Sequence, residues 1–231
     1  TLGSIRARNT FQHTESNSRM QTVVLAAGEG TRMRPLTAHT PKPMLPVAGR
    51  PLVVHCLEDA IAAGASRVTV VVGYEADTVR AALADREWPV PVETATQPTQ
   101  RGTADAVRAA RDTLRDDPFA VLNGDVLYDR TSLASLYDAG PAVGSFRVEN
   151  PSAYGVLRVD DDRVRGVVEK PADPPSDLVN AGAYVFPAEA RDWLNVDERT
   201  RGEAELTDVL QRTCETTALS AVPFERWLDV G

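Results

Sequence analysis

Short apolar runs alternate with amphipathic stretches through the first half of the chain. Apolar runs with the length of buried strands lie at 21–27, 67–74, 90–97 and 119–125. Stretches with helical periodicity lie between them, at 51–64, 76–86 and 103–114. Strands that alternate with helices predict right-handed βαβ units, so we expect a parallel sheet with helices on both faces.

The rhythm changes after residue 125. A short helix is predicted near 131–139, and strands then follow without helices between them, at 142–148, 154–160, 163–169 and 180–187. Such strands indicate antiparallel ribbons added to the sheet. Residues 203–215 predict a last amphipathic helix. We therefore expect an α/β fold with a mixed, mainly parallel sheet and an added antiparallel ribbon.

The first 19 residues differ from the rest of the chain. They are rich in Arg, Ser, Thr and Asn and show neither helical nor strand periodicity. We expect residues 1–19 to be a disordered extension before a single domain over residues 20–231. A chain of 231 residues is long enough to bury about 70% of its unfolded surface, which suits one domain of this size.

Charge and apolar content exclude several kinds of partner. The formal net charge is −8, which opposes nonspecific binding to nucleic acid or to an anionic membrane. No run reaches the roughly 18 apolar residues of a membrane helix, and no secretory signal is recognisable. We expect a cytoplasmic protein with no nucleic-acid or membrane partner. Cys56 and Cys214 lack the paired spacing of a metal or redox site and are predicted to be reduced core thiols.

Lysine is rare in this chain. Only two of the 25 basic residues are lysines, Lys42 and Lys170, so arginine serves as the general surface cation. One interpretation is chance or a bias in codon usage. The other is that these two positions require a compact ammonium, as in contacts to phosphate. Composition alone leaves both interpretations open.

A glycine-rich loop follows the first predicted strand. Gly28 and Gly30 lie at the carboxyl end of that strand, where glycines let backbone N–H groups approach phosphate oxygens. The loop lacks the Lys-Ser/Thr of a P-loop, and Met33 stands where a dinucleotide fingerprint has its third glycine. Arg32 can clamp a polyphosphate through its guanidinium. A plain tight turn is the alternative interpretation of the glycines.

Several charged residues follow the ends of other predicted strands. Lys42 lies between two prolines, which fix the direction of an extended segment. Asp125 follows a buried strand, where a carboxylate can hold Mg²⁺ against a bound phosphate or can simply cap a turn. Asp229 allows the same two interpretations. Glu169 and Lys170 are either part of a site or a surface ion pair.

Taken in order, these motifs resemble those of the sugar-phosphate nucleotidyltransferases, which join a nucleoside triphosphate to a sugar 1-phosphate. The resemblance runs from Met20 to Gly231 and rests on LAAGEGTRMRPLT, PKPMLPVAGRPL, Gln97 five residues before Gly102-Thr103, NGD, YGVL, EKP, NAG, GEAELTD and WLDVG. It implies a Rossmann-like, GT-A-like sheet, the fold of nucleotide-diphospho-sugar transferases.

Three of the motifs are most similar to the archaeal branch of that family: YGVL, EKPADPPSDLVNAG and GEAELTD. That branch acts on glucose 1-phosphate or N-acetylglucosamine 1-phosphate with dTTP or UTP. Many of its members carry a C-terminal left-handed β-helix with acetyltransferase activity. The 231 residues end before such a segment, so we expect a catalytic domain truncated at its C-terminus.

The resemblance also implies a role for individual positions. The implied nucleotide-binding residues are Leu25, Ala26, Ala27, Gly28, Gly30, Thr31, Arg32, Gln97, Gly102 and Thr103. The implied sugar-phosphate-binding residues are Gly155, Glu169, Lys170 and Asn180. Asp125 and Asp229 are expected to hold Mg²⁺. The residues expected to act in catalysis are Arg32, Lys42, Asp125 and Lys170.

The reaction that the resemblance implies is a single in-line displacement. An oxygen of the sugar 1-phosphate attacks the α-phosphorus of the triphosphate, and pyrophosphate leaves. The expected partners are these two small molecules, and the sequence leaves a homo-oligomer open. The rival function is a domain of the same fold that senses sugar nucleotides without turnover, although the charged residues of the site are all retained. A dinucleotide-dependent oxidoreductase fails on Met33 and on a second strand that ends without an acidic residue.

Overall fold

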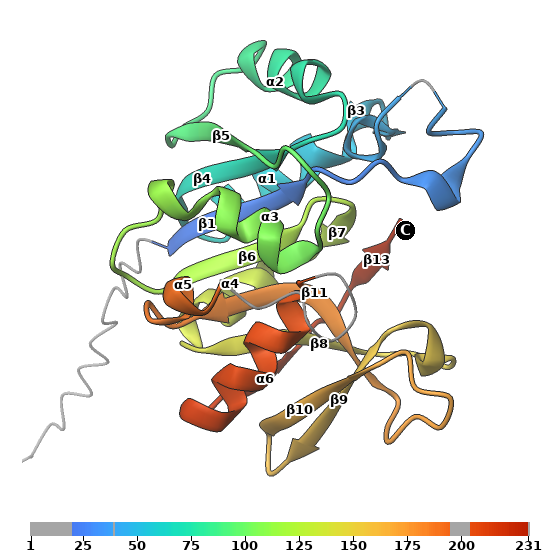
Figure 1. Cartoon of the computed structure of the whole chain (residues 1–231), viewed down its shortest axis with the longest axis vertical. Coiled ribbons are helices and arrows are strands. Elements are labelled where there is room, and N and C mark those ends of the chain that lie inside the picture. Colours follow the sequence, from blue (N-terminus) through green and yellow to red (C-terminus); the bar gives the residue numbers. More distant parts are fainter. Residues whose placement is uncertain (1–19, 39, 195–203, 231) are drawn as a thin grey trace, which may run out of the picture.

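The computed structural model describes residues 20–38, 40–194 and 204–230 (Figure 1). The prediction that residues 1–19 form a disordered extension lies outside these ranges. Within them, a nine-stranded sheet runs through the whole molecule, and two pairs of short strands stand beside it.

The first half of the sheet is parallel, as predicted. β1 (Met20–Ala26) lies between β4 (Ala65–Val72) and β6 (Phe119–Asn123), and β5 (Val92–Thr96) pairs with the outer side of β4, all in parallel. The helices that connect these strands are α1 (Leu52–Ala62), α2 (Ala76–Ala84) and α3 (Thr103–Ala109). The carboxyl ends of β1, β5 and β6 therefore meet at one edge of the sheet.

Beyond β6 most pairings are antiparallel. β11 (Leu178–Phe186) lies antiparallel between β6 and β8 (Ala142–Arg147), while β12 (Ser220–Pro223) pairs in parallel with β8. β10 (Arg163–Glu169) pairs antiparallel with both β12 and β9 (Gly155–Asp160). The sheet is therefore mixed. The expectation of a mainly parallel sheet holds only for the first half, because no crossover helix joins β8, β9, β10 and β11.

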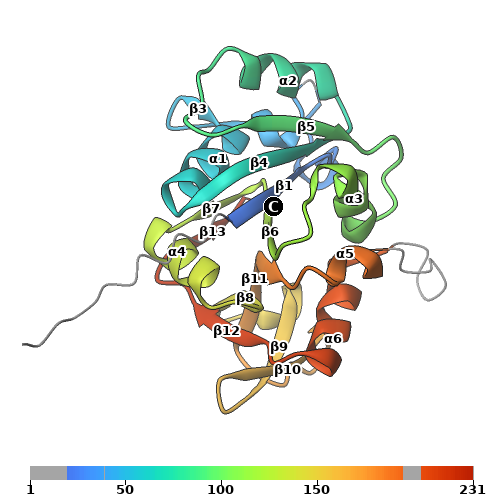
Figure 2. The same cartoon turned by 90° about the vertical axis from the view of Figure 1, so that its left-hand side faces the viewer.

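Helices cover both faces of the sheet, as Figure 2 shows. α1 and α4 (Arg130–Asp138) pack on one face, and α3, α5 (Ala190–Trp193) and α6 (Leu206–Thr216) lie on the other. Each face has its own buried cluster, and successive residues of β1 alternate between them: Val24 packs in the first cluster and Val23 in the second. None of the helices in the described part of the chain has the length and apolar character needed to cross a membrane.

The sequence pattern missed several short elements. β7 (Val126–Tyr128) and β13 (Trp227–Asp229) form an antiparallel ribbon, and β2 (Pro46–Val47) and β3 (Arg50–Pro51) form another. Two or three residues are too few to show a period of 2, so such strands leave no signal in the sequence. The helix predicted over 103–114 ends at Ala109, and a 3-10 turn at Arg111–Thr113 replaces its last part.

Candidate active site

Two adjoining cavities lie where the parallel strands end. The smaller has a volume of about 340 Å³ and the larger about 820 Å³. Four residues line both of them: Thr103, Asn123, Asp125 and Glu205. Because the two cavities share these walls, two ligands bound in them would meet beside Asp125.

The smaller cavity contains most of the predicted nucleotide-binding residues. Its lining includes Leu25, Ala27, Gly28, Gln97, Gly102 and Thr103. Ala26 is buried in the sheet, and neither Gly30 nor Thr31, which begins the 3-10 turn Thr31–Met33, is among the lining residues. The structure thus brings the glycine loop together with the segment at Gln97–Thr103, which lies about 70 residues later in the chain.

The glycine loop is held by specific contacts. Gly30 has a φ of +70°, and a Cβ at this position would lie 2.8 Å from the Cβ of Lys42. The Thr37 hydroxyl donates to the Gly30 carbonyl over 2.7 Å, and the Gln100 amide donates to the Ala27 carbonyl over 3.1 Å. Gly30 therefore gives the loop its left-handed turn and makes room for Lys42.

Lys42 and Asp125 form an ion pair in the wall of the larger cavity. The Lys42 ammonium donates to the Asp125 carboxylate, and only 13% of the Lys42 side chain is exposed. η2 (Lys42–Met44), which the lysine begins, follows the extended Pro41. The direction that the flanking prolines were predicted to give this lysine is thus toward the end of β6.

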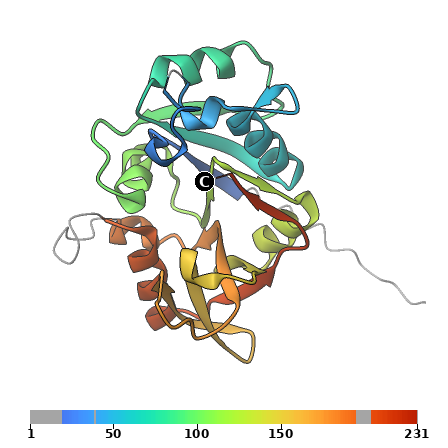
Figure 3. The same cartoon turned by 90° about the vertical axis from the view of Figure 1, so that its right-hand side faces the viewer.

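Asp229 reaches the same place from the other end of the chain. In the β7–β13 ribbon Asp229 lies opposite Val126, the residue after Asp125, and the Val230 amide donates to the Asp125 carbonyl over 3.2 Å. Figure 3 shows β13, in red, between the two halves of the molecule. Asp125 and Asp229 both line the larger cavity.

This donor set fits a Mg²⁺ ion that is held together with substrate. Mg²⁺ is commonly bound through one or two carboxylates, with phosphate oxygens and water filling the other positions. No group of three or more His, Cys, Asp or Glu residues within the described ranges is arranged to hold a metal by itself. Asp125 lines both cavities and Asp229 lines the larger one, and two such carboxylates suit an ion shared with bound phosphates, whereas a closed structural metal site needs more protein ligands.

The larger cavity also contains the predicted sugar-phosphate residues, Gly155, Glu169, Lys170 and Asn180. The Lys170 ammonium lies 3.7 Å from the Glu169 carboxylate, and Lys170 has a φ of 41°. Its amide donates to the Tyr154 carbonyl over 3.0 Å, which extends the pairing of β10 with β9 by one position beyond Glu169 and Gly155. The two lysines of the chain therefore line one cavity.

An irregularity in β11 sets the positions of Asn180 and Gly182 in the wall of the larger cavity. The register of β11 against β8 shifts between Asn180 and Tyr184, and Gly182 has a φ of +70°. The Asn180 side chain accepts from the Gly182 amide over 2.9 Å and donates to the Tyr184 hydroxyl over 2.6 Å. These bonds fix the Asn180 side chain in the cavity wall.

Tyr128, which the sequence analysis did not single out, joins this irregularity to β6. Its buried hydroxyl donates to the Gly182 carbonyl over 2.7 Å and accepts from the Asn123 amide over 3.1 Å. Burial raises the pKa of Tyr128 well above its ordinary value and that of Tyr184 to about 12, so both hydroxyls stay protonated. A single tyrosine in a three-residue strand carries no sequence signal for this role.

Trp227 and Glu205 are two further residues that the site predictions missed. The Trp227 indole donates to the Ala181 carbonyl over 2.9 Å and stacks edge-on against Tyr154, 5.4 Å between ring centroids. Glu205 accepts from the Thr103 hydroxyl over 2.7 Å, and that hydroxyl accepts from the Leu206 amide. Both residues stand inside the motifs WLDVG and GEAELTD, so position within those motifs was the available signal.

Of the predicted catalytic residues, the structure brings Lys42, Asp125 and Lys170 into the larger cavity. Arg32 lies in the 3-10 turn at Thr31–Met33, and its role stays a prediction.

Residues 21–231 match the family model described as nucleotidyl transferase. The chain belongs to this family. Among the curated relatives of this nucleotidyl transferase is the UTP–glucose-1-phosphate uridylyltransferase AglF of Haloferax volcanii, with 36% identity over 92% of this chain and 91% of the relative. The bifunctional protein GlmU of Methanococcus maripaludis shares 35% identity, and the chain spans about half (51%) of its length. A mannose-1-phosphate guanylyltransferase of Mycobacterium tuberculosis shares 35% identity over 60% of its length.

Solved structures share the fold of this nucleotidyl transferase. A UDP-glucose pyrophosphorylase from Acinetobacter baumanii superposes with a TM-score of 0.80 over 91% of this chain and 88% of that one, at 24% identity. A UDP-glucose pyrophosphorylase in complex with UDP-glucose gives a TM-score of 0.78 over 91% of this chain and 92% of that one, at 23% identity. The mixed sheet with its antiparallel half is therefore a fold that other proteins of this kind adopt.

Proposed function

We propose that residues 20–231 form a catalytic domain that transfers a nucleoside monophosphate from a triphosphate to a sugar 1-phosphate and releases pyrophosphate. The observation that carries this proposal is the junction of the two cavities. Asp125 lines both of them, and Lys42 and Asp229 lie beside it in the larger one. A reaction between two phosphate-bearing ligands needs positive charge at such a junction, from a lysine or from a metal ion held by carboxylates, to offset the negative charge of the phosphates.

The smaller cavity suits the nucleoside triphosphate. Its wall combines the Gly28 loop, which offers backbone N–H groups to phosphate oxygens, with the Gln97–Thr103 segment, which offers polar groups to a base. The larger cavity suits the sugar 1-phosphate. Glu169 and Asn180 there offer hydrogen-bonding groups to hydroxyls, and Lys170 offers a cation to the phosphate.

The proposed chemistry is a displacement at phosphorus with no covalent enzyme intermediate. Both reactants are polyanions, so positioning and charge neutralisation supply most of the acceleration. Asp125 and Asp229 would hold Mg²⁺, which when bound neutralises phosphate charge and aligns the two phosphates. Lys42 would stabilise the charge that develops on the departing pyrophosphate. Arg32, from the glycine loop, would share that task.

For the substrates we propose UTP or dTTP with glucose 1-phosphate or N-acetylglucosamine 1-phosphate. The name of the Haloferax relative specifies UTP and glucose 1-phosphate. The name of the Mycobacterium relative specifies mannose 1-phosphate and guanylyl transfer, so GTP with mannose 1-phosphate must be tested beside these substrates. UTP and dTTP differ by the methyl group of the base and by the 2′-hydroxyl of the sugar, and a methyl group is worth only about 1 to 3 kcal/mol in the fit of a pocket.

The test is pyrophosphate release by the whole chain with Mg²⁺. UTP and dTTP are each combined with glucose 1-phosphate and N-acetylglucosamine 1-phosphate, and GTP is combined with mannose 1-phosphate. Steady turnover with one of the first four pairs, lost on chelation of Mg²⁺, is the expected result. A folded chain that binds nucleotide but releases no pyrophosphate with any pair contradicts the proposal and favours a sensor of sugar nucleotides.

A further inference from the structure

A buried carboxylate stands next to the nucleotide cavity without lining it. Asp105 lies in the first turn of α3, and only 7% of the residue is exposed. One of its oxygens accepts a hydrogen bond from the Gln97 amide nitrogen over 2.9 Å. The other accepts from Arg108, whose side chain is half exposed. Gln97 itself lines the cavity, so Asp105 contacts a cavity residue from behind.

The neighbours of Gln97 decide which end of its amide faces the ligand. The amide nitrogen donates to Asp105 and also to the Gly102 carbonyl, over 3.2 Å. A carbonyl and a carboxylate are both acceptors, so an amide turned the other way would set its oxygen against two further oxygens. Both hydrogens of the amide nitrogen are thus directed into the protein. The amide oxygen is the end of Gln97 left to accept from a ligand.

Asp105 can hold the Gln97 amide in this orientation only while its carboxyl group is ionised. Burial by itself would raise the pKa of this carboxyl, but the hydrogen bonds from Gln97 and Arg108 and the charges of Arg108 and Arg101 outweigh it and hold the pKa below its ordinary value. At neutral pH the carboxylate has no proton to donate. It therefore accepts only the nitrogen end of the Gln97 amide.

We propose that Asp105 is a positioning residue that fixes the Gln97 amide with its oxygen toward the base, so that the cavity selects bases with an N–H at their pairing edge. The inference rests on the proposed function, because it assigns the smaller cavity to a nucleotide. Uracil and thymine present an imide N–H to an acceptor. Cytosine presents a lone pair at the same ring position, which would oppose the Gln97 oxygen.

The experiment compares the wild-type chain with Asp105→Asn and with Arg108→Gln as a matched control. An asparagine can both donate and accept, so it allows Gln97 to turn, whereas Arg108→Gln leaves the carboxylate in place. The readout is the ratio of the dissociation constants of CMP and UMP, measured by titration calorimetry. We expect Asp105→Asn to lower this ratio by about 10-fold, the value of one misplaced hydrogen bond, and Arg108→Gln to change it less than about 3-fold. Equal weakening of both nucleotides by Asp105→Asn overturns the proposal.

A second measurement uses the wild-type chain and does not depend on whether the variant folds. N3-methyl-UMP carries a methyl group in place of that N–H, so it cannot donate to Gln97 and cannot approach the Gln97 oxygen as closely. We expect it to bind at least about 10-fold more weakly than UMP. Equal affinities overturn the proposal. Because both readouts are equilibrium binding, they stand apart from pyrophosphate release: a chain that selects UMP without turnover keeps this inference and loses the proposed catalysis.

Discussion

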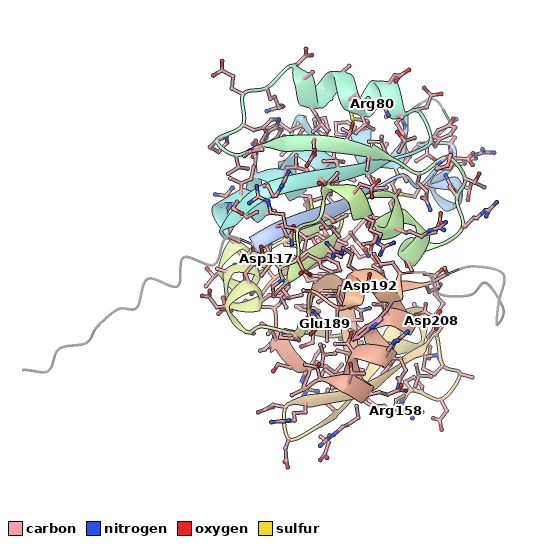
Figure 4. The ribbon with its side chains drawn as sticks, turned by 60° about the vertical axis from the view of Figure 1, so that its left-hand side comes forward. Arg80, Asp117, Arg158, Glu189, Asp192 and Asp208 are labelled. Atoms are coloured by element: carbon pink, nitrogen blue, oxygen red, sulfur yellow. The ribbon has the colours of Figure 1, made fainter. Side chains whose placement is uncertain are left out.

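Lys42 is held between the glycine loop and the end of β6, with its ammonium on Asp125. In the proposed reaction this ammonium stabilises charge that develops on pyrophosphate, so Lys42→Ala should lower kcat by about 10² to 10³ with a smaller change in KM. Arg111→Ala is the control, because Arg111 is a cation in an exposed pair with Asp192, which Figure 4 labels, and neither residue lines the two cavities. A kcat within about 3-fold of wild type in Lys42→Ala contradicts the assignment.

Two glycines with a similar positive φ allow backbone strain to be separated from side-chain contact. Gly182 has a φ of +70° and Gly140 a φ of +76°, but a Cβ on Gly182 would overlap the side-chain amide nitrogen of Asn123, whereas a Cβ on Gly140 would meet nothing within 4 Å. Gly140→Ala should cost only the backbone strain, about 1 kcal/mol of unfolding free energy. Gly182→Ala should lower the free energy of unfolding by clearly more than Gly140→Ala and should also raise KM for the sugar 1-phosphate. Urea unfolding and initial rates measure both; equal losses in the two variants would show that the Asn123 contact is unimportant.

Among single residues, the sequence predicts those whose residue type and local position alone mark them as candidates for the site. Lys42, Asp125 and Lys170 stand out as rare cations or as carboxylates after buried strands, and the structure brings all three to one cavity. Tyr128 and Asp105 could not be found in this way. Their importance comes from hydrogen bonds to groups that are remote in the sequence, such as the Gly182 carbonyl and the Gln97 amide.

Among the elements, α4 depends on a single capping residue. Asp129 precedes it, and its carboxylate accepts from the Thr131 and Ser132 amides, each over 3.2 Å, and from the Ser132 hydroxyl. Asp129→Ala should therefore lower the free energy of unfolding by about 1 to 2 kcal/mol at pH 7. Asp129→Asn keeps an accepting oxygen and is expected to retain most of that stability.

The pH dependence of this cap has a definite sign. The Ser132 hydroxyl is the main cause that holds the pKa of Asp129 below its ordinary value. A depressed pKa in the folded state contributes stability above the ordinary value near pH 4, and this contribution is lost as the pH falls through the lower pKa. The difference in unfolding free energy between wild type and Asp129→Ala should shrink on going from pH 7 to about pH 3. An unchanged difference would mean that the charge of the cap does not matter.

The predicted elements succeed where periodicity is long enough to read. β1, β4 and α1 follow runs of seven or more residues, and each lies within a few residues of its predicted span. The β7–β13 ribbon was missed because each of its strands has three residues and their pairing joins positions about 100 residues apart. That ribbon is nevertheless the element that sets Asp229 beside Asp125.

Across the whole molecule, the sheet changes from parallel to antiparallel at the pairing of β6 with β11. The parallel half supplies the smaller cavity, and the antiparallel half supplies most of the wall of the larger one. Alternating strands and helices predicted the first half well. The order of the remaining strands depends on long-range packing, so a local pattern could indicate ribbons but not where they pair.

In the proposed reaction a sugar phosphate oxygen attacks the α-phosphorus at the junction of these cavities. This step is tested most directly by following ¹⁸O from the phosphate oxygens of labelled glucose 1-phosphate and N-acetylglucosamine 1-phosphate, with Mg²⁺ and UTP or dTTP, by mass spectrometry. The expected products are a nucleoside diphosphate sugar that retains every labelled oxygen and unlabelled pyrophosphate. No such product with any pair, or label recovered in pyrophosphate, would contradict it.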